Sequence, residues 1–191
     1  MTPPYKFYVQ RFAPDGTPVE ANARDTYGYW NVACQEFPYN PYNELKELPK
    51  RDWKDEHGVS VFIPSDGMKL KDFDIQVKFI ATAVQGIATP SAEEMLRINI
   101  RSFLNFIYGL AGGDSGVSGD GSSLAIFDEY TQVGFGLVTA NKLSNSVIEI
   151  KTGATECIAT FTITFHVNDP VPFKKTSAMT YLPWRGYSPN N

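Results

Sequence analysis

Apolar and polar residues alternate without a break near the C-terminal end of this 191-residue chain. Phe161, Ile163, Phe165 and Val167 are separated by threonines and by His166. Successive side chains of a β-strand point to opposite faces, so this pattern predicts a strand with one buried face and one polar face. Residues 73–79 repeat the pattern, and the chain must therefore build a core between or beneath antiparallel strands.

One amphipathic helix is expected over residues 92–108. Ser91 followed three residues later by Glu94 forms a capping box, in which each side chain satisfies an unpaired backbone N–H group. Five apolar residues then recur at spacings of three and four until Gly109, which suits a left-handed C-terminal cap. These five residues are Leu96, Ile100, Phe103, Leu104 and Ile107. The helix should cover one side of a sheet.

Further strands are predicted at residues 124–127, 133–140, 147–151 and 157–167, and also at 5–12, 27–35 and 59–63. A tight turn is expected at residues 13–18, and a Gly- and Ser-rich mobile loop at 112–123. The predicted fold class is mainly β (α+β), an antiparallel β-sandwich or barrel with one flanking helix. We expect a single domain over residues 1–173, with an irregular N-terminal region at 1–58 and a C-terminal extension at 174–191.

Charge and cysteine content exclude several functions. The net charge of −4 is unsuited to a sequence-specific nucleic-acid binder, which needs clustered Lys and Arg to neutralise phosphates. No run of about 18 apolar residues predicts a membrane span, and the N-terminus lacks the pattern of a secretion signal, so we expect synthesis in a cytoplasm. Cys34 and Cys157 are expected to be reduced thiols, with a disulfide left as the minority alternative.

No catalytic site, cofactor site or metal site is predicted. Residues 113–116, Gly-Asp-Ser-Gly, are similar to the nucleophile segment of trypsin-like proteases, but the serine lies in a flexible tract and Val117 replaces an expected glycine. Neither His57 nor His166 has the flanking residues of a catalytic base, and His166 is interpreted as a surface or interface histidine. The two histidines and two cysteines do not have zinc-site spacing.

A family resemblance covers about residues 59–173. The long alternating strand and capped helix are followed by Leu-Ala-Ile-Phe-Asp at 124–128, Val-Gly-Phe-Gly-Leu-Val at 133–138, and a Thr/Phe strand that closes on Asp169-Pro170. This order resembles the N-terminal domain of siphophage distal tail proteins, and tail-tube proteins share a similar sandwich. Two departures are the aromatic N-terminal region and the lack of a separate galectin-like domain.

The resemblance implies a structural protein of the virion tail that forms a homo-oligomeric ring, for which we expect a hexamer. Its other partners would be tail or baseplate proteins, and an acidic balance would let DNA slide through the ring without sticking. Irregular segments at 36–55 and 173–191 are expected to lie across a neighbouring subunit. The candidate interaction residues are aromatic: Phe37, Tyr39, Tyr42, Trp53, Tyr181 and Trp184.

A carbohydrate- or surface-binding β-sandwich is the alternative function. It is suggested by aromatic residues that often line sugar sites: Trp30, Tyr39, Tyr42, Trp53 and Trp184. Under this alternative the isolated monomer would bind glycans, and replacing one of these rings by alanine would abolish binding.

Overall fold

The computed structural model describes residues 5–38, 44–52, 59–65, 67–84, 91–109, 123–143, 148–153, 156–175 and 181–183. Within them lie ten strands and two helices, so the fold is mainly β (α+β), as predicted. The elements are β1 (Phe7–Phe12), β2 (Arg24–Asp25), α1 (Thr26–Trp30), β3 (Val32–Glu36), β4 (Lys50–Asp52), β5 (Val59–Val61), β6 (Phe73–Val84), α2 (Ala92–Tyr108), β7 (Ser123–Asp128), β8 (Val133–Leu143), β9 (Glu149–Thr152) and β10 (Glu156–Val167).

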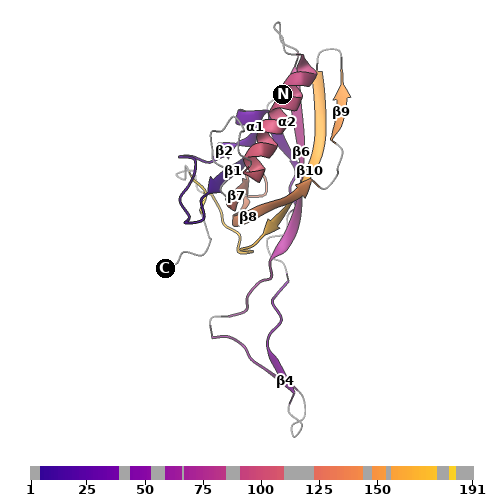
Figure 1. Ribbon diagram of the computed structural model, residues 1–191. Helices are drawn as coiled ribbons and strands as arrows, with labels where there is room; N and C mark the ends of the chain where they lie inside the picture. Colours follow the sequence, from indigo (N-terminus) through magenta and orange to yellow (C-terminus); the bar gives the residue numbers. More distant parts are fainter. Residues whose placement is uncertain are drawn as a thin grey trace.

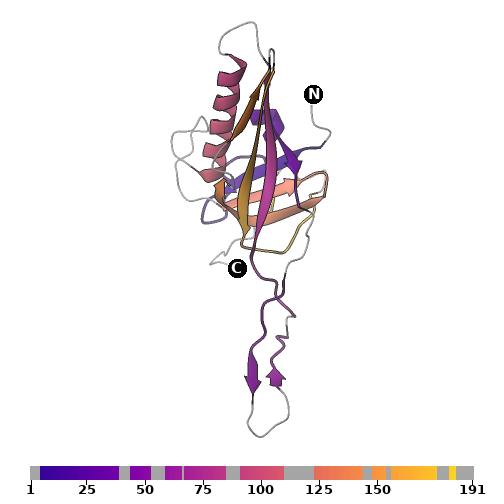
Figure 2. The same ribbon diagram turned by 90° about the vertical axis from the view of Figure 1, so that its right-hand side faces the viewer.

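Eight strands form one antiparallel sheet in the order β2-β1-β7-β8-β10-β6-β3, with β9 beside β10. β10 pairs along its whole length with β6 and shares its other edge between β9 and β8. The sheet bends so strongly that β1 meets β6, although three strands separate them in the sheet: the Phe7 and Phe79 ring centroids are 5.4 Å apart. In Figure 2 the strands of the two halves cross, which makes the arrangement sandwich-like.

The main core fills the space between the two halves of the sheet and α2. Phe79 and Phe161 are register partners on β6 and β10, and their rings lie 5.8 Å apart. Phe103 of α2 contacts both rings and is fully buried. The predicted helix is confirmed with its caps, since the Ser91 side chain accepts from the Glu94 N–H and Gly109 has a φ of 63°. Figure 1 shows α2 running along β6 and β10.

The strand predicted at residues 27–35 is wrong in its first half. Asp25 caps α1 by accepting from the Tyr27 N–H, and Asn31 ends the helix with a φ of 52°. The side chain of Trp30 then packs against Phe103 and Phe106 of α2, with ring centroids 5.5 and 4.8 Å away. Tertiary burial of this indole outweighs the strand preference of the aromatic run. Only β3, after Asn31, joins the sheet.

The N-terminal strand β1 is part of the body of the protein. β1 occupies an interior position of the sheet between β2 and β7, and the turn predicted at residues 13–18 follows it. In that turn the Gly16 N–H donates to the Ala13 carbonyl at 2.9 Å, and Gly16 has a φ of 84°. The expectation of an irregular region over 1–58 therefore applies to less of the chain than predicted.

The opposite face of β1 and β7 carries a second, smaller core. It consists of Phe12, Ala125, Phe127, Phe173 and Leu182. Leu182 is fully buried, and its backbone N–H donates to the Gln10 side chain at 2.6 Å. We call this arrangement the C-terminal clamp. Phe173 and Leu182 of the C-terminal segment thus pack on their own chain. The contact of this segment with a neighbouring subunit stays a prediction.

Gly134 is the position where the clamp tolerates no side chain. Gly134 and Phe173 exchange two backbone hydrogen bonds, of 3.1 and 2.8 Å. A Cβ atom on Gly134 would lie 2.6 Å from Phe173 Cζ and 2.7 Å from the Ile126 carbonyl oxygen. Both approaches are too close for a methyl group, and the oxygen belongs to a central strand that cannot move away.

We expect Gly134→Ala to lower the free energy of unfolding by about 1–3 kcal/mol, the usual cost of overpacking. Chemical denaturation of the purified variant measures this loss. Gly28→Ala is the matched control, because its Cβ would meet only the Asp25 side chain, at 3.3 Å. If Gly134→Ala were as stable as the natural protein, the close packing of Phe173 would be refuted.

Candidate interaction surfaces

A two-stranded arm projects from the body between β3 and β6. We define the arm as residues 44–71, of which 53–58 and 66 lie outside the described residues. β4 and β5 pair in antiparallel fashion, with Lys50 opposite Val61, and an isolated bridge joins Leu45 to Leu70 nearer the body. The Lys46 N–H donates to the Lys69 carbonyl at 2.7 Å, and the Lys71 N–H to the Glu44 carbonyl at 2.7 Å. Figures 1 and 2 show the arm extending far from the sheet.

The arm exposes apolar side chains on more than one face. Val61 is 45% exposed, and Phe62 and Ile63 are each 65% exposed. Leu45 and Met68, which lie nearer the body, are also exposed. The sequence predicted a strand at residues 59–63 but did not indicate that its apolar side chains are exposed. The signal that was missed is the loss of alternation, because Val61, Phe62 and Ile63 are consecutive apolar residues followed by Pro64.

The predicted aromatic surface residues do not form one cluster among the described residues. Phe37 lies in the main core, with its ring 5.9 Å from Phe7. Tyr181 is 55% exposed and adjoins the C-terminal clamp. The other predicted residues, Tyr39, Tyr42, Trp53 and Trp184, lie outside the described residues, as do His57, Ser115 and the loop before Ser123. Trp30, considered for sugar binding, is only 5% exposed and belongs to the main core.

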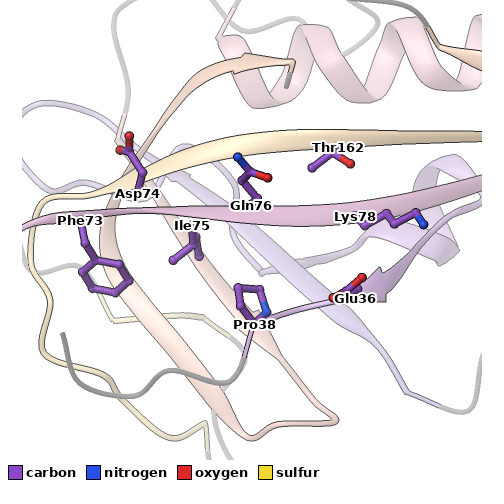
Figure 3. A pocket seen from close by; sticks show the side chains of 8 residues that line it. All are labelled: Glu36, Pro38, Phe73, Asp74, Ile75, Gln76, Lys78 and Thr162. Carbon is purple, nitrogen blue, oxygen red and sulfur yellow. The ribbon is translucent and has the colours of Figure 1, made fainter. Parts of the chain in front are cut away.

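A hollow of about 440 Å³ lies where the arm joins the body. Its lining comes from β3, β6 and β10 and from the residues that follow β3, and it is drawn in Figure 3: Glu36, Pro38, Phe73, Asp74, Ile75, Gln76, Lys78 and Thr162. β3 pairs with β6 only from Lys78 to Ala81, so no described strand covers this edge of β6 at residues 73–77. Pro38 lacks an N–H donor and cannot extend the pairing.

His166 lies on the polar side of β10, as predicted, between two carboxylates near the arm. Its Nδ1 is 2.7 Å from Asp74 Oδ1, and its Nε2 is 3.2 Å from Asp72 Oδ2. A protonated imidazole can donate to both acids, which ties β10 to the residues that follow the arm. Within the described ranges no group of three or more His, Cys, Asp or Glu residues is arranged to hold a metal ion.

The two cysteines are both free thiols. Cys157 is buried on β10, and Cys34 is partly buried on β3. Burial raises the pKa of the Cys34 thiol, and the negative charge of Asp128 adds to the rise. The thiol therefore stays protonated and unreactive at neutral pH. The prediction of reduced cysteines is confirmed.

A second cavity, of about 360 Å³, lies between α1 and α2. We call it the helix pocket, and its lining residues are Arg24, Tyr29, Trp30, Ile98, Asn99, Ser102 and Phe106. The Trp30 Nε1–H donates to Ser102 Oγ at 3.2 Å, which fixes the indole against α2. Sequence reasoning missed this pocket, because Arg24 directly precedes α1, and the residues of α1 were predicted as part of a strand.

No helix in the described part of the chain is long and apolar enough to cross a membrane.

Comparison with known proteins identified solved structures that are similar to this chain. No protein-family model matches the sequence, and no curated protein matches it. One of them is the Dit protein (gp 19.1) of phage SPP1, described as a paradigm of hub adsorption apparatus in Gram-positive infecting phages. The two chains share 17% sequence identity with a TM-score of 0.43 over 88% of this chain. This chain spans about half of the Dit protein, with 52% of it covered.

Proposed function

We propose that this chain is a structural component of a bacteriophage tail, a distal-tail or tail-tube-like protein that acts by self-assembly and by contact with neighbouring tail proteins. The proposal rests first on the sequence resemblance over residues 59–173. The elements that make up that resemblance form at their predicted places: β6, α2, β7, β8 and β10. They contribute to one continuous core.

The arm is the observation that carries the proposal. A two-stranded hairpin without a third strand or a covering helix is marginally stable in water. The described part of the arm has neither support, and it exposes Val61, Phe62 and Ile63. Burial of one such side chain against a partner contributes about 1.5–3 kcal/mol. Contact with another protein would therefore both order the arm and remove its apolar surface from water.

Repeated use of one such contact generates a ring. An arm that binds a different surface on the next copy makes a heterologous contact, which closes into a ring when its rotation fits a whole number of subunits. We propose a hexamer as the closed form, with tail or baseplate proteins stacked on it. The main alternative is an open chain of subunits, which electron microscopy would distinguish directly.

Substituting two exposed apolar residues of the arm provides a direct test of the assembly role. The double variant Phe62→Ser and Ile63→Ser is expected to fold as the natural protein does, since both side chains are 65% exposed. It should fail to enter assembled particles, because the apolar contact is lost. Particle content is measured by immunoblot of purified virions, and folding by denaturant unfolding of the isolated chain. Val84→Ser, at a residue 69% exposed on the body, is the control and should be incorporated normally.

Location in the particle provides the second measurement. Electron microscopy with a specific antibody should place the natural protein in the tail tube or at its tip. Density outside these regions, or absence of the chain from virions, would overturn the proposed function.

A further inference from the structure

The helix pocket is lined by the positively charged side chain of Arg24, which has no negatively charged partner among the described residues. The Arg24 guanidinium lies over three rings, 4.9 Å from the Phe106 centroid, 5.1 Å from Tyr29 and 5.8 Å from Trp30. Stacking occupies the faces of the guanidinium but leaves its N–H edge available. No carboxylate among the described residues forms an ion pair with Arg24.

A second arginine at the same ring shows that this lack of a partner is specific to Arg24. Arg11 also stacks on Phe106, at 4.3 Å, but it is bonded to Glu20, with Arg11 Nη2 2.6 Å from Glu20 Oε1. Both side chains of that pair are buried. The fold therefore supplies a carboxylate to one arginine of the ring and leaves the other facing an open cavity.

The remaining polar groups of the helix pocket are mainly donors. Ser102 Oγ accepts from the Trp30 indole, so its hydroxyl hydrogen is free to donate. The Asn99 side chain, which also lines the pocket, has an NH₂ group that can donate. At the rim, Tyr29 is 62% exposed and Ile98 43% exposed. An arginine fork, two neutral donors and an apolar rim fit a carboxylate carried next to apolar groups.

The arm has the complementary properties. Glu47 and Asp52 are exposed, and neither has an ion-pair partner among the described residues. They lie on the same arm as the exposed Leu45, Phe62 and Ile63. The arm extends away from the body in both views, so its strands β4 and β5 are placed to reach another molecule (Figures 1 and 2). One chain therefore carries both an unpaired arginine pocket and unpaired acids on an apolar arm.

We propose that the helix pocket is the acceptor for the arm of a second copy of this chain, with a carboxylate of Glu47 or Asp52 bound by Arg24. The apolar side chains of the arm then lie on Tyr29 and Ile98. This inference deepens the self-assembly part of the proposed function, and it identifies the surface on which the arm docks.

Intermolecular paramagnetic relaxation tests the contact on the full chain in solution. A spin label is attached to Lys50→Cys, an exposed position on β4, in a chain without ¹⁵N. That chain also carries Cys34→Ala, and Cys157 is 2% exposed and is not modified. This chain is mixed with the ¹⁵N-labelled natural chain. We expect concentration-dependent broadening of the Ile98 and Asn99 amide signals and of the Trp30 indole signal, which is assigned by comparison with Trp53→Phe and Trp184→Phe.

Charge removal on either side should abolish the effect. Arg24→Gln in the ¹⁵N-labelled chain, or Glu47→Gln with Asp52→Asn in the spin-labelled chain, should weaken association at least about tenfold, since a charged hydrogen-bonded pair is lost. Arg101→Gln, at an exposed arginine of α2, is the control and should change nothing. ¹⁵N spectra of each variant verify that it is folded.

Broadening at the pocket that persists in Arg24→Gln would overturn the proposal. So would a lack of broadening in the natural ¹⁵N-labelled chain at concentrations up to about 1 mM. Loss in Arg24→Gln without loss in the Glu47 and Asp52 variant would also overturn it, by assigning the pocket to another carboxylate. These measurements use purified chain alone, so they are independent of whether the protein is found in a virion tail.

Discussion

Replacing Phe103 by alanine is expected to lower the free energy of unfolding by about 3–5 kcal/mol. Phe103 is fully buried and connects the helix to the sheet, with its ring 5.2 Å from Phe79 and 6.2 Å from Phe161. It also contacts Trp30, which anchors α1. The cavity left by the ring would therefore loosen three elements at once, and neighbouring backbone in a long sheet cannot collapse to fill it.

Denaturant unfolding of the purified variant measures this loss. Phe62→Ala is the matched control, because the same ring is removed from a residue 65% exposed on the arm. The control should change stability by no more than about 0.5 kcal/mol in the isolated chain. Equal stability of the two variants would show that α2 is not packed on β6 and β10 as described.

Replacing Arg11 by methionine should destabilise the chain by about 3–5 kcal/mol, because it leaves Glu20 buried without a cation. Arg11 is 1% exposed, and Glu20 accepts three hydrogen bonds from it, through its side-chain Nε and Nη2 and its backbone N–H. The loss of stacking on Phe106 adds a smaller cost.

The double variant Arg11→Met and Glu20→Leu separates the two contributions. Removing both charges avoids the isolated carboxylate, so this variant should recover most of the stability lost in Arg11→Met. The measurement is the free energy of unfolding of the two single variants and the double variant. If the double variant were as unstable as Arg11→Met, packing of the Arg11 guanidinium would be the main source of stability at residue 11. The unpaired buried charge of Glu20 would then not explain the stability lost in Arg11→Met.

The parts of the fold that could be predicted are those whose local pattern and burial agree. The alternation in β6 and β10 is matched by their burial, and the stripe on α2 faces the core through Leu96, Phe103 and Ile107. These elements carry periodicity over enough residues for the pattern to be unambiguous. Their register with one another follows from the same faces being buried.

Contacts between residues far apart in sequence decide the parts that were missed. α1 forms because Trp30 finds a site on α2, which no local pattern around Tyr27 could indicate. The C-terminal clamp depends on the hydrogen bond between the Leu182 N–H and the Gln10 side chain. Phe37 lies in the core because its ring packs against that of Phe7. At the candidate interaction surface, aromatic content alone did not distinguish core rings from exposed ones. The position of Arg24 in the helix pocket depends on contacts with three rings from two helices, which the sequence around it does not indicate.

The position of β1 has a consequence for how the chain folds during synthesis. β1 is paired with β7, which is made only after the arm, β6 and α2. At roughly 5–20 residues per second, the ribosome leaves β1 without this partner for on the order of ten seconds. An unpaired strand containing Phe7, Val9 and Phe12 is prone to aggregate in that interval, and a charge within it opposes aggregation. We therefore expect Arg11 to protect the nascent strand before Glu20 and the finished sheet enclose it.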